Sequence, residues 1–156
     1  MSFKLSKKSL DRLEGVHPDL IKVVKRAIEL SRIDFGVSCG TRTKSQQLAL
    51  VKSGASQTMN SKHLPQASDG FSHAVDLIAY VDGRVSWELN LYDDLADAMK
   101  KACKELGVSL KWGASWHIQN ICDWSGTCEA AMNVYIDLRR SEGRRPFIDG
   151  PHFELS

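Results

Sequence analysis

The most constraining segment of this chain is the run HAVDLIAYV at 73–81. It alternates and is rich in β-forming residues, which is typical of a strand. Asp82-Gly83 follows, a strong signal for a tight hairpin turn, and RVSW at 84–87 can return as the next strand. The hairpin indicates an antiparallel sheet.

The remaining periodic segments add helices without forming regular βαβ units. Leu91, Leu95, Ala98 and Ala102 recur at helical spacing within 88–107, and Gly107 can cap that helix. We also expect helices over 18–31, before Gly54 and over 128–143, and strands over 34–39, 108–112 and 151–155. The sequence therefore predicts an α+β fold in which helices pack on a small antiparallel sheet. The length of 156 residues fits a single domain, 1–156.

Charge and hydropathy exclude several classes of partner. The formal net charge is +2, and no lysine-rich or aromatic-studded basic strip is present, so we expect no nucleic acid partner. No apolar run approaches the roughly 20 residues of a membrane helix, so we expect no membrane insertion. The N-terminal 15 residues lack the apolar core of a secretory signal, which predicts folding in a cytoplasm.

Four cysteines are present: Cys39, Cys103, Cys122 and Cys128. In a cytoplasmic chain we expect them to be reduced packing residues. Cys122 and Cys128 are close enough in sequence to pair or to bind a metal, but no CxxC motif supports a zinc ribbon.

His63, Asp76 and His152 form a candidate catalytic zinc site. Such a site needs three protein ligands and an open position for water, and imidazole and carboxylate are suitable ligands. Asp76 lies between apolar neighbours in a strand-like run, which requires an explanation. A metal is one explanation, and a salt bridge or a capped turn is another, so the pattern alone leaves the choice open.

Two motifs resemble a known family. SKH…HAVDL and DGPHFEL are similar to the Ser-x-His-x-x-Gly-x-Ala-x-Asp and late Asp-Gly-x-His motifs of the zinc D-alanyl-D-alanine carboxypeptidase and L-alanyl-D-glutamate endopeptidase family, particularly its phage endolysins. The similarity extends from MSFKL through GTRTKSQQ and WELNLYDDLADAMKKACKELGVSLKWG to the end of the chain. It implies a hedgehog/D-Ala-D-Ala-peptidase-like fold, Zn2+ as cofactor, and His63, Asp76 and His152 as its ligands.

The same resemblance implies roles for residues around the metal. Asp149, three residues before the last ligand, matches the catalytic general base. Arg42 matches an arginine that holds a substrate carbonyl or carboxylate and stabilises negative charge. We assign Gln46, Ser61 and His73 as substrate-binding candidates.

The chain departs from the family pattern in two places. Twelve residues separate His63 from Asp76, so 65–72 forms an enlarged loop, and a second insertion spans 115–146. His73 occupies a variable slot, and strand alternation points it away from the face of Asp76. Glu154 shares a strand face with His152 and could orient it, although a solvent-facing acid is the default expectation.

These observations predict a phage endolysin that hydrolyses the L-alanyl-D-glutamate bond of peptidoglycan stem peptides by metal-activated water. The alternatives are a D-Ala-D-Ala carboxypeptidase with the same ligands and a non-catalytic, zinc-stabilised wall-binding module. We expect a monomer that accumulates in the host bacterial cytoplasm and acts in the periplasm and cell wall after release.

Overall fold

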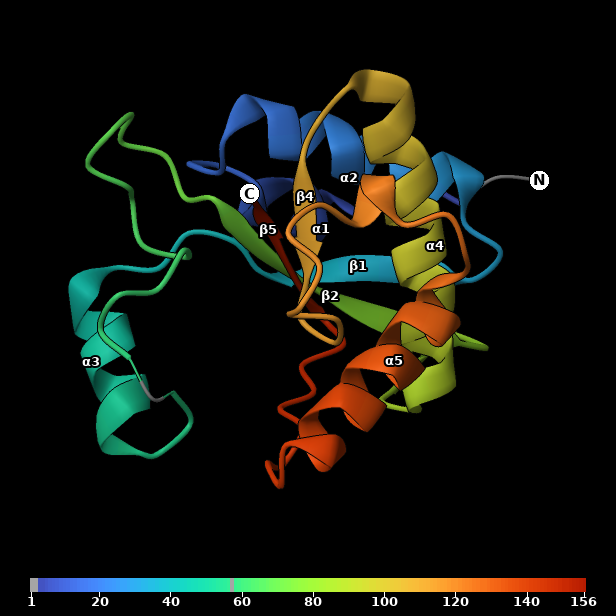
Figure 1. The fold of residues 1–156 in the computed structure, drawn as a ribbon. Helices are drawn as coiled ribbons and strands as arrows, with labels where there is room; N and C mark the ends of the chain where they lie inside the picture. Colours follow the sequence, from blue (N-terminus) through green and yellow to red (C-terminus); the bar gives the residue numbers. More distant parts are fainter. Residues whose placement is uncertain (1–2, 57) are drawn as a thin grey trace.

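The computed structural model describes residues 3–56 and 58–156, and the structural statements below refer to these residues. Its helices are α1 (Lys7–Arg12), α2 (Pro18–Leu30), α3 (Lys44–Lys52), α4 (Leu89–Leu106) and α5 (Cys128–Ser141), with a short 3-10 helix η1 (Ile121–Asp123). The strands are β1 (Asp34–Cys39), β2 (Ala74–Val81), β3 (Arg84–Ser86), β4 (Leu110–Trp112) and β5 (His152–Leu155). The predicted α+β class is confirmed (Figure 1).

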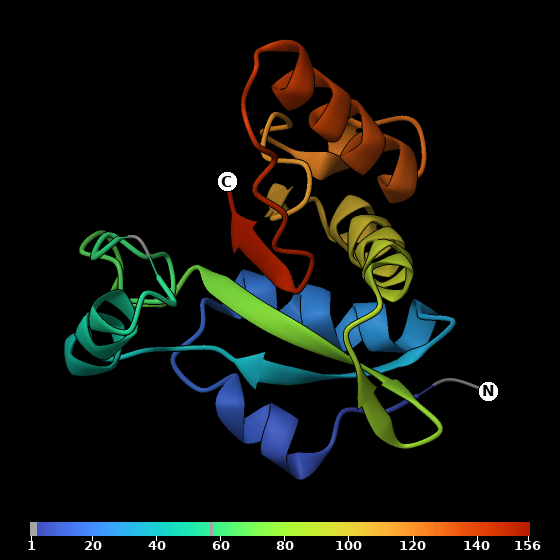
Figure 2. The same ribbon diagram turned by 90° about the horizontal axis from the view of Figure 1, so that it is seen from below.

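The strands form one antiparallel sheet in the order β1-β2-β5-β4, and β3 pairs with the far end of β2. The last strand of the chain is therefore internal, and Figure 2 shows β5 in red beside β2. The register places Asp76 of β2 opposite His152 of β5 and Cys39 of β1. Three strands that are distant in sequence thus bring these residues into one row.

Alternation along β2 separates a buried face from a more open one. Val75, Leu77 and Ala79 are fully buried, whereas Asp76 and the alternate residues that follow it are only partly buried. The buried face belongs to one contiguous hydrophobic core that also includes residues of α2 and α4. These two helices lie side by side against the sheet (Figures 1 and 2). Asp76 consequently lies on the face that the core leaves free.

Local sequence signals account for the observed helix ends. Pro18 begins α2, Thr43 and Gln46 form a capping box at the start of α3, and Gly107 ends α4 with a left-handed φ of 68°. The expected β2–β3 hairpin also forms, with positive φ at both Asp82 and Gly83. The sequence analysis missed α1, because its six residues are too few to display helical periodicity.

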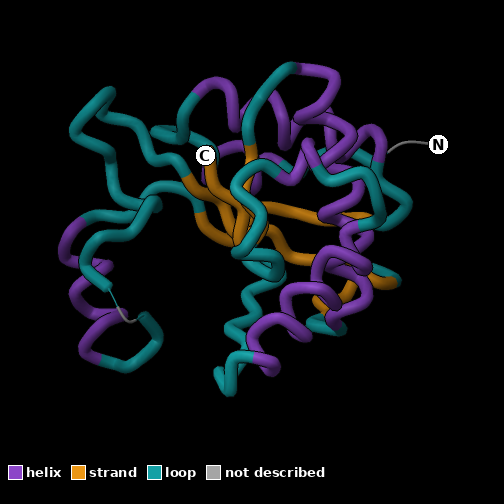
Figure 3. Tube along the Cα trace, viewed as in Figure 1, coloured by secondary structure: helices purple, strands orange, loops and turns teal. Residues whose placement is uncertain are grey.

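The two segments that differ from the family pattern have different structures. The 65–72 segment is a loop of turns, whereas 115–146 contains η1 and α5 (Figure 3). Within the described residues, no helix combines the length and apolar character needed to cross a bilayer.

The expectation of four reduced cysteines is wrong for one pair. Cys103 of α4 and Cys122 of η1 form a disulfide, with their Cα atoms 6.7 Å apart. The partner of Cys122 is therefore Cys103 rather than Cys128, because η1 folds back against α4. Cys39 and Cys128 are free, and Cys128 is buried as expected of a packing cysteine.

Candidate metal centre

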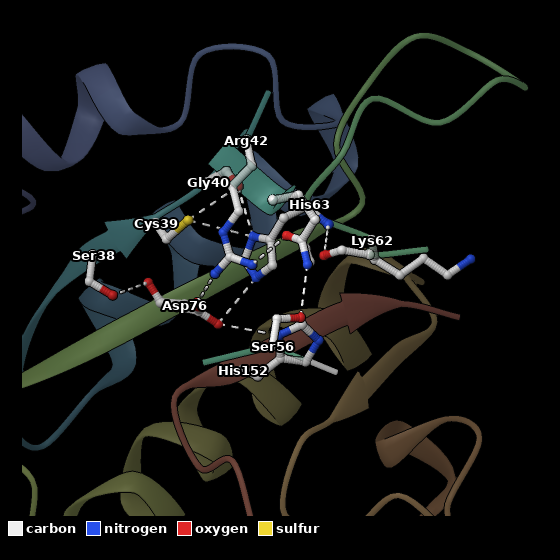
Figure 4. A network of polar contacts seen from close by, with 12 residues as sticks. Ser38, Cys39, Gly40, Arg42, Ser56, Lys62, His63, Asp76 and His152 are labelled. Atoms are coloured by element: carbon white, nitrogen blue, oxygen red, sulfur yellow. Dashed lines mark hydrogen bonds and ion pairs between the residues drawn. The ribbon is translucent and has the colours of Figure 1, made fainter. Parts of the chain in front are cut away.

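His63, Asp76 and His152 converge on the open face of the sheet (Figure 4). Oδ1 of Asp76 lies 3.3 Å from Nε2 of His63 and 3.2 Å from Nδ1 of His152. The two imidazole centroids are 5.2 Å apart. The structure thus brings together three predicted ligands that come from a loop, a central strand and the last strand of the chain.

Hydrogen bonds determine which ring nitrogen of each imidazole faces Asp76. Nδ1–H of His63 donates to the Gly40 carbonyl at 2.8 Å, which leaves the Nε2 lone pair facing Asp76. Nε2–H of His152 donates to Glu154 at 2.8 Å, which leaves its Nδ1 lone pair facing the same carboxylate. Partners of this kind orient imidazole ligands in metal sites.

One atom of this cluster has no partner. Among residues 3–56 and 58–156, the buried Nε2 of His63 finds no hydrogen-bond partner, because its approach to Asp76 lacks suitable geometry. A buried nitrogen that remains unpaired is costly. The two imidazole nitrogens and the Asp76 carboxylate between them are N and O donors of the kind that a divalent cation such as Zn2+ accepts.

The charges of the cluster support the same interpretation. Burial opposes protonation of both imidazoles, but Asp76 outweighs it, together with Cys39 at His63 and Glu154 at His152. The pKa of His63 is raised to about 10 and that of His152 to about 9. Burial likewise opposes ionisation of Asp76, yet the two imidazoles hold the pKa of its carboxyl well below the usual value. The site therefore favours an ionised Asp76 together with positive charge, which a divalent cation can supply in place of the protons.

Asp149 lies at the edge of this cluster, in the turn that precedes β5. A ligand oxygen of Asp149 lies within 4.8 Å of ligand atoms of both Asp76 and His152. Backbone bonds from Asp149 N to Gly113 O (2.8 Å) and from Gly113 N to His152 O (2.8 Å) fix the turn. Burial, followed by the charge of Asp76, raises the pKa of the Asp149 carboxyl above its ordinary value. A carboxylate of raised basicity beside a metal position is suited to accept a proton.

Arg42 comes from the loop between β1 and α3. Its Nη2 donates to Asp76 Oδ2 at 3.3 Å, and its backbone N–H donates to the His63 carbonyl at 2.9 Å. The predicted position of Arg42 at the centre therefore agrees with the geometry, and its guanidinium can also meet a substrate oxygen there.

The three substrate-binding candidates have different surroundings. Gln46 is exposed, and its side-chain oxygen accepts from Thr43 N in the capping box of α3. Ser61 accepts from the backbone N–H of His63 at 3.1 Å, so it orients a ligand-bearing turn. Nε2 of His73 lies 2.8 Å from Oδ2 of Asp69, in the 65–72 loop.

Sequence reasoning missed Gln47, the neighbour of Gln46. Gln47 is completely buried, and its oxygen accepts from Arg42 Nη1 at 3.1 Å. Its amide nitrogen donates to Ser56 Oγ at 2.8 Å and to the Thr58 carbonyl at 2.7 Å. Gln47 therefore orients Arg42, and only its position on the inward face of α3 distinguishes it from Gln46.

The default expectation for Glu154 is also wrong. Its side chain is only 15% exposed and bonds His152 Nε2, because residues two apart on a strand share a face. His117 lies outside the centre, with its ring stacked on Tyr135 of α5 at 5.7 Å. Trp116 does reach the centre, since its ring lies 5.5 Å from that of His152.

Comparison with known proteins gives a consistent result. The family model described as phage L-alanyl-D-glutamate peptidase matches residues 1–156. The L-alanyl-D-glutamate peptidase of Escherichia phage T5 is 36% identical over 159 residues, covering 99% of each chain. The crystal structure of Serratia marcescens L-Ala D-Glu endopeptidase ChiX matches with a TM-score of 0.71 and 32% identity, covering 99% of this chain and 91% of that one.

These matches confirm the resemblance inferred from the SKH…HAVDL and DGPHFEL motifs, and with it the expectation of a peptidase of the endolysin type. The chain belongs to the phage L-alanyl-D-glutamate peptidase family.

Proposed function

We propose that this chain is a zinc-dependent endopeptidase that hydrolyses the L-alanyl-D-glutamate bond of peptidoglycan stem peptides. The observation that carries the proposal is the convergence of His63, Asp76 and His152 with a buried, unpaired imidazole nitrogen at the centre. The bond specificity follows from the names of the matched family and relatives. We further propose that the protein is made in the host cytoplasm and acts on the wall after release, as a monomer.

The three ligands would hold Zn2+ through His63 Nε2, an Asp76 oxygen and His152 Nδ1. When bound, the zinc would supply Lewis acidity and a water whose pKa is lowered to about 7. Gly40 and Glu154 would keep the imidazoles in the required tautomers, since each accepts the other ring N–H.

The surrounding residues would carry the proton and the developing charge. Asp149 is placed to take a proton from the attacking water and to pass it to the leaving amine. Arg42 would stabilise the negative oxygen of the tetrahedral intermediate, held in position by Asp76 and Gln47. The half-buried surroundings strengthen both interactions, because a lower local dielectric screens charges less.

Mass spectrometry of digested peptidoglycan tests the proposal. Purified sacculi are incubated at neutral pH with the zinc-loaded protein, with chelator-treated protein as a control. We expect fragments that end at L-alanine and begin at D-glutamate, and their loss after metal removal and return with added zinc. Released free D-alanine would instead identify a carboxypeptidase. Intact wall material in the presence of bound zinc would indicate a non-catalytic module.

A further inference from the structure

A groove of about 840 Å³ begins beside the proposed metal centre and runs between α1, the 38–42 segment and α3. The side chains that matter for the argument are Asp11, Arg12, Glu14, Cys39 and Arg42, all of which line it. No function described so far uses this groove.

The groove is continuous with the centre. Arg42 lines the groove and also donates through Nη2 to Asp76 Oδ2 at 3.3 Å. Cys39 lines it as well, and its Sγ lies 3.8 Å from Nδ1 of His63. If Arg42 holds a peptide at the metal, the part of the peptide on one side of the cleaved bond would therefore lie at the mouth of this groove.

The groove carries both signs of charge on exposed side chains. Asp11 and Glu14 are exposed, and neither forms an ion pair among the described residues. Nη1 of Arg12 donates to the Val37 carbonyl at 3.0 Å, and the rest of the guanidinium remains available to a ligand. Such a surface complements a ligand that has both carboxylates and an ammonium group.

Gly40 keeps the two walls of the groove close together. A Cβ at this position would collide with the backbone carbonyl of Arg12 and approach Val16. The end of α1, with its charged side chains, can therefore lie directly against the segment that leads from Cys39 to Arg42. The groove therefore results from the close packing of the backbone at Gly40 and is not a gap between loops.

The other side of the centre has a different character. Trp116 packs near His152, donates through Nε1 to the Phe147 carbonyl, and lies 6.1 Å from the Phe147 ring, which is 53% exposed. The cluster thus has aromatic surface beside His152 and charged surface beside Arg42.

We propose that the groove binds the charged half of the stem peptide, namely the D-glutamate and the diamino acid that follows it. This inference rests on the proposed function. Of the two sides of the L-Ala–D-Glu bond, the alanine side leads through an uncharged lactyl group to a sugar. The other side has the free carboxylate of D-glutamate and then an amino acid with a side-chain ammonium, which in diaminopimelate is accompanied by a carboxylate. Arg42 and Arg12 suit the carboxylates, and Asp11 and Glu14 suit the ammonium group.

Three synthetic substrates test the groove. Each contains L-Ala-γ-D-Glu followed by diaminopimelate, lysine or norleucine. The side chain of the third residue therefore has two charges, one charge or none. With zinc-loaded wild-type protein we expect kcat/KM to decrease in that order, mainly through KM. The double variant D11N/E14Q should lose about tenfold on the lysine and diaminopimelate substrates and less than about twofold on norleucine. R12Q, which keeps a donor for the Val37 carbonyl, should remove the preference for diaminopimelate over lysine.

D137N is the matched control, because Asp137 is exposed on α5 and lies outside the groove. It should retain the substrate order of the wild type. If the groove variants show that same order and the same KM values, the groove proposal is wrong while the peptidase proposal stands. If the wild type cleaves neither these peptides nor sacculi, the proposed function itself fails.

Discussion

Asp76 and His152 face each other across the antiparallel pair β2/β5, with the carboxylate Oδ1 3.2 Å from Nδ1 of the imidazole. Directly opposed residues on neighbouring strands have a fixed separation, so the sheet itself sets this half of the proposed metal centre. His63 joins from a loop whose backbone is tied to Arg42. The rigid pair and the tethered loop residue together define the site on which the following predictions rest.

Replacement of Asp149 should separate turnover from metal binding. Asp149→Asn keeps the size of the side chain and the backbone bonds to Gly113, but the amide cannot accept the proton of the attacking water. We expect kcat to fall by about 10²–10⁴-fold, with zinc content unchanged. Lysis assays beside elemental analysis of the metal check this. A variant that keeps wild-type turnover would rule out Asp149 as the base.

Gln47 should influence catalysis only through Arg42. We expect Gln47→Leu to lower kcat/KM by about tenfold or more, because Arg42 loses the acceptor that orients it. Asn133→Leu is the matched control, since Asn133 has an exposed amide on α5 and lies outside the groove. It should change kcat/KM by less than about twofold.

A double-mutant cycle distinguishes this role from general destabilisation. Gln47→Leu also removes the closer of the two donors to the Thr58 carbonyl, so stability should fall by about 1–3 kcal/mol. If Gln47 acts through Arg42, then in an Arg42→Ala background the same change should have little further effect on kcat/KM. Additive losses would show that Gln47 acts on catalysis by another route.

Glu154 should strengthen metal binding by fixing the tautomer of His152. Glu154→Gln replaces a charged acceptor 2.8 Å from Nε2 with an amide. The amide stabilises the tautomer of His152 that has Nε2–H and a free Nδ1 less strongly. We expect zinc affinity to fall by about 10–100-fold in competition with a chromogenic chelator. Glu142→Gln, on the exposed end of α5, is the control. Equal zinc affinities in the two variants would show that Glu154 does not contribute to metal binding.

The sequence predicted the elements that local pattern can specify. The hairpin at Asp82-Gly83, the cap at Gly107 and the strand around Asp76 all depend on near neighbours, and all formed where expected. Gln47 was missed and Glu154 was misassigned, because their roles depend on burial and on side-chain partners that only the folded chain reveals. The pairing of Cys103 with Cys122 likewise follows from η1 folding back on α4, which spacing alone does not reveal.

Asp93 should make the stability of the protein depend on pH, independently of the metal centre. It is buried on α4, and burial together with the nearby carboxylates of Asp94 and Glu129 raises the pKa of Asp93 to about 6. The unfolded chain has a pKa near 3.9 for aspartate. The folded state therefore holds this proton more tightly, so the contribution of Asp93 to stability is greatest below about pH 4 and decreases as pH rises through about 6.

Asp93→Asn should abolish the loss of stability at high pH, because the amide resembles the protonated acid at every pH. We expect the variant to be more stable than the wild type at pH 7.5, by about 1–3 kcal/mol, and the difference to disappear near pH 4. Urea unfolding at the two pH values measures both quantities, with Asp137→Asn as an exposed control. Because Asp93 faces a pocket lined by α4 and residues 125–129, with no residue of the proposed metal centre, zinc content and kcat should match the wild type. A variant that is equally stabilised at both pH values would show that packing, rather than the charge of Asp93, is responsible.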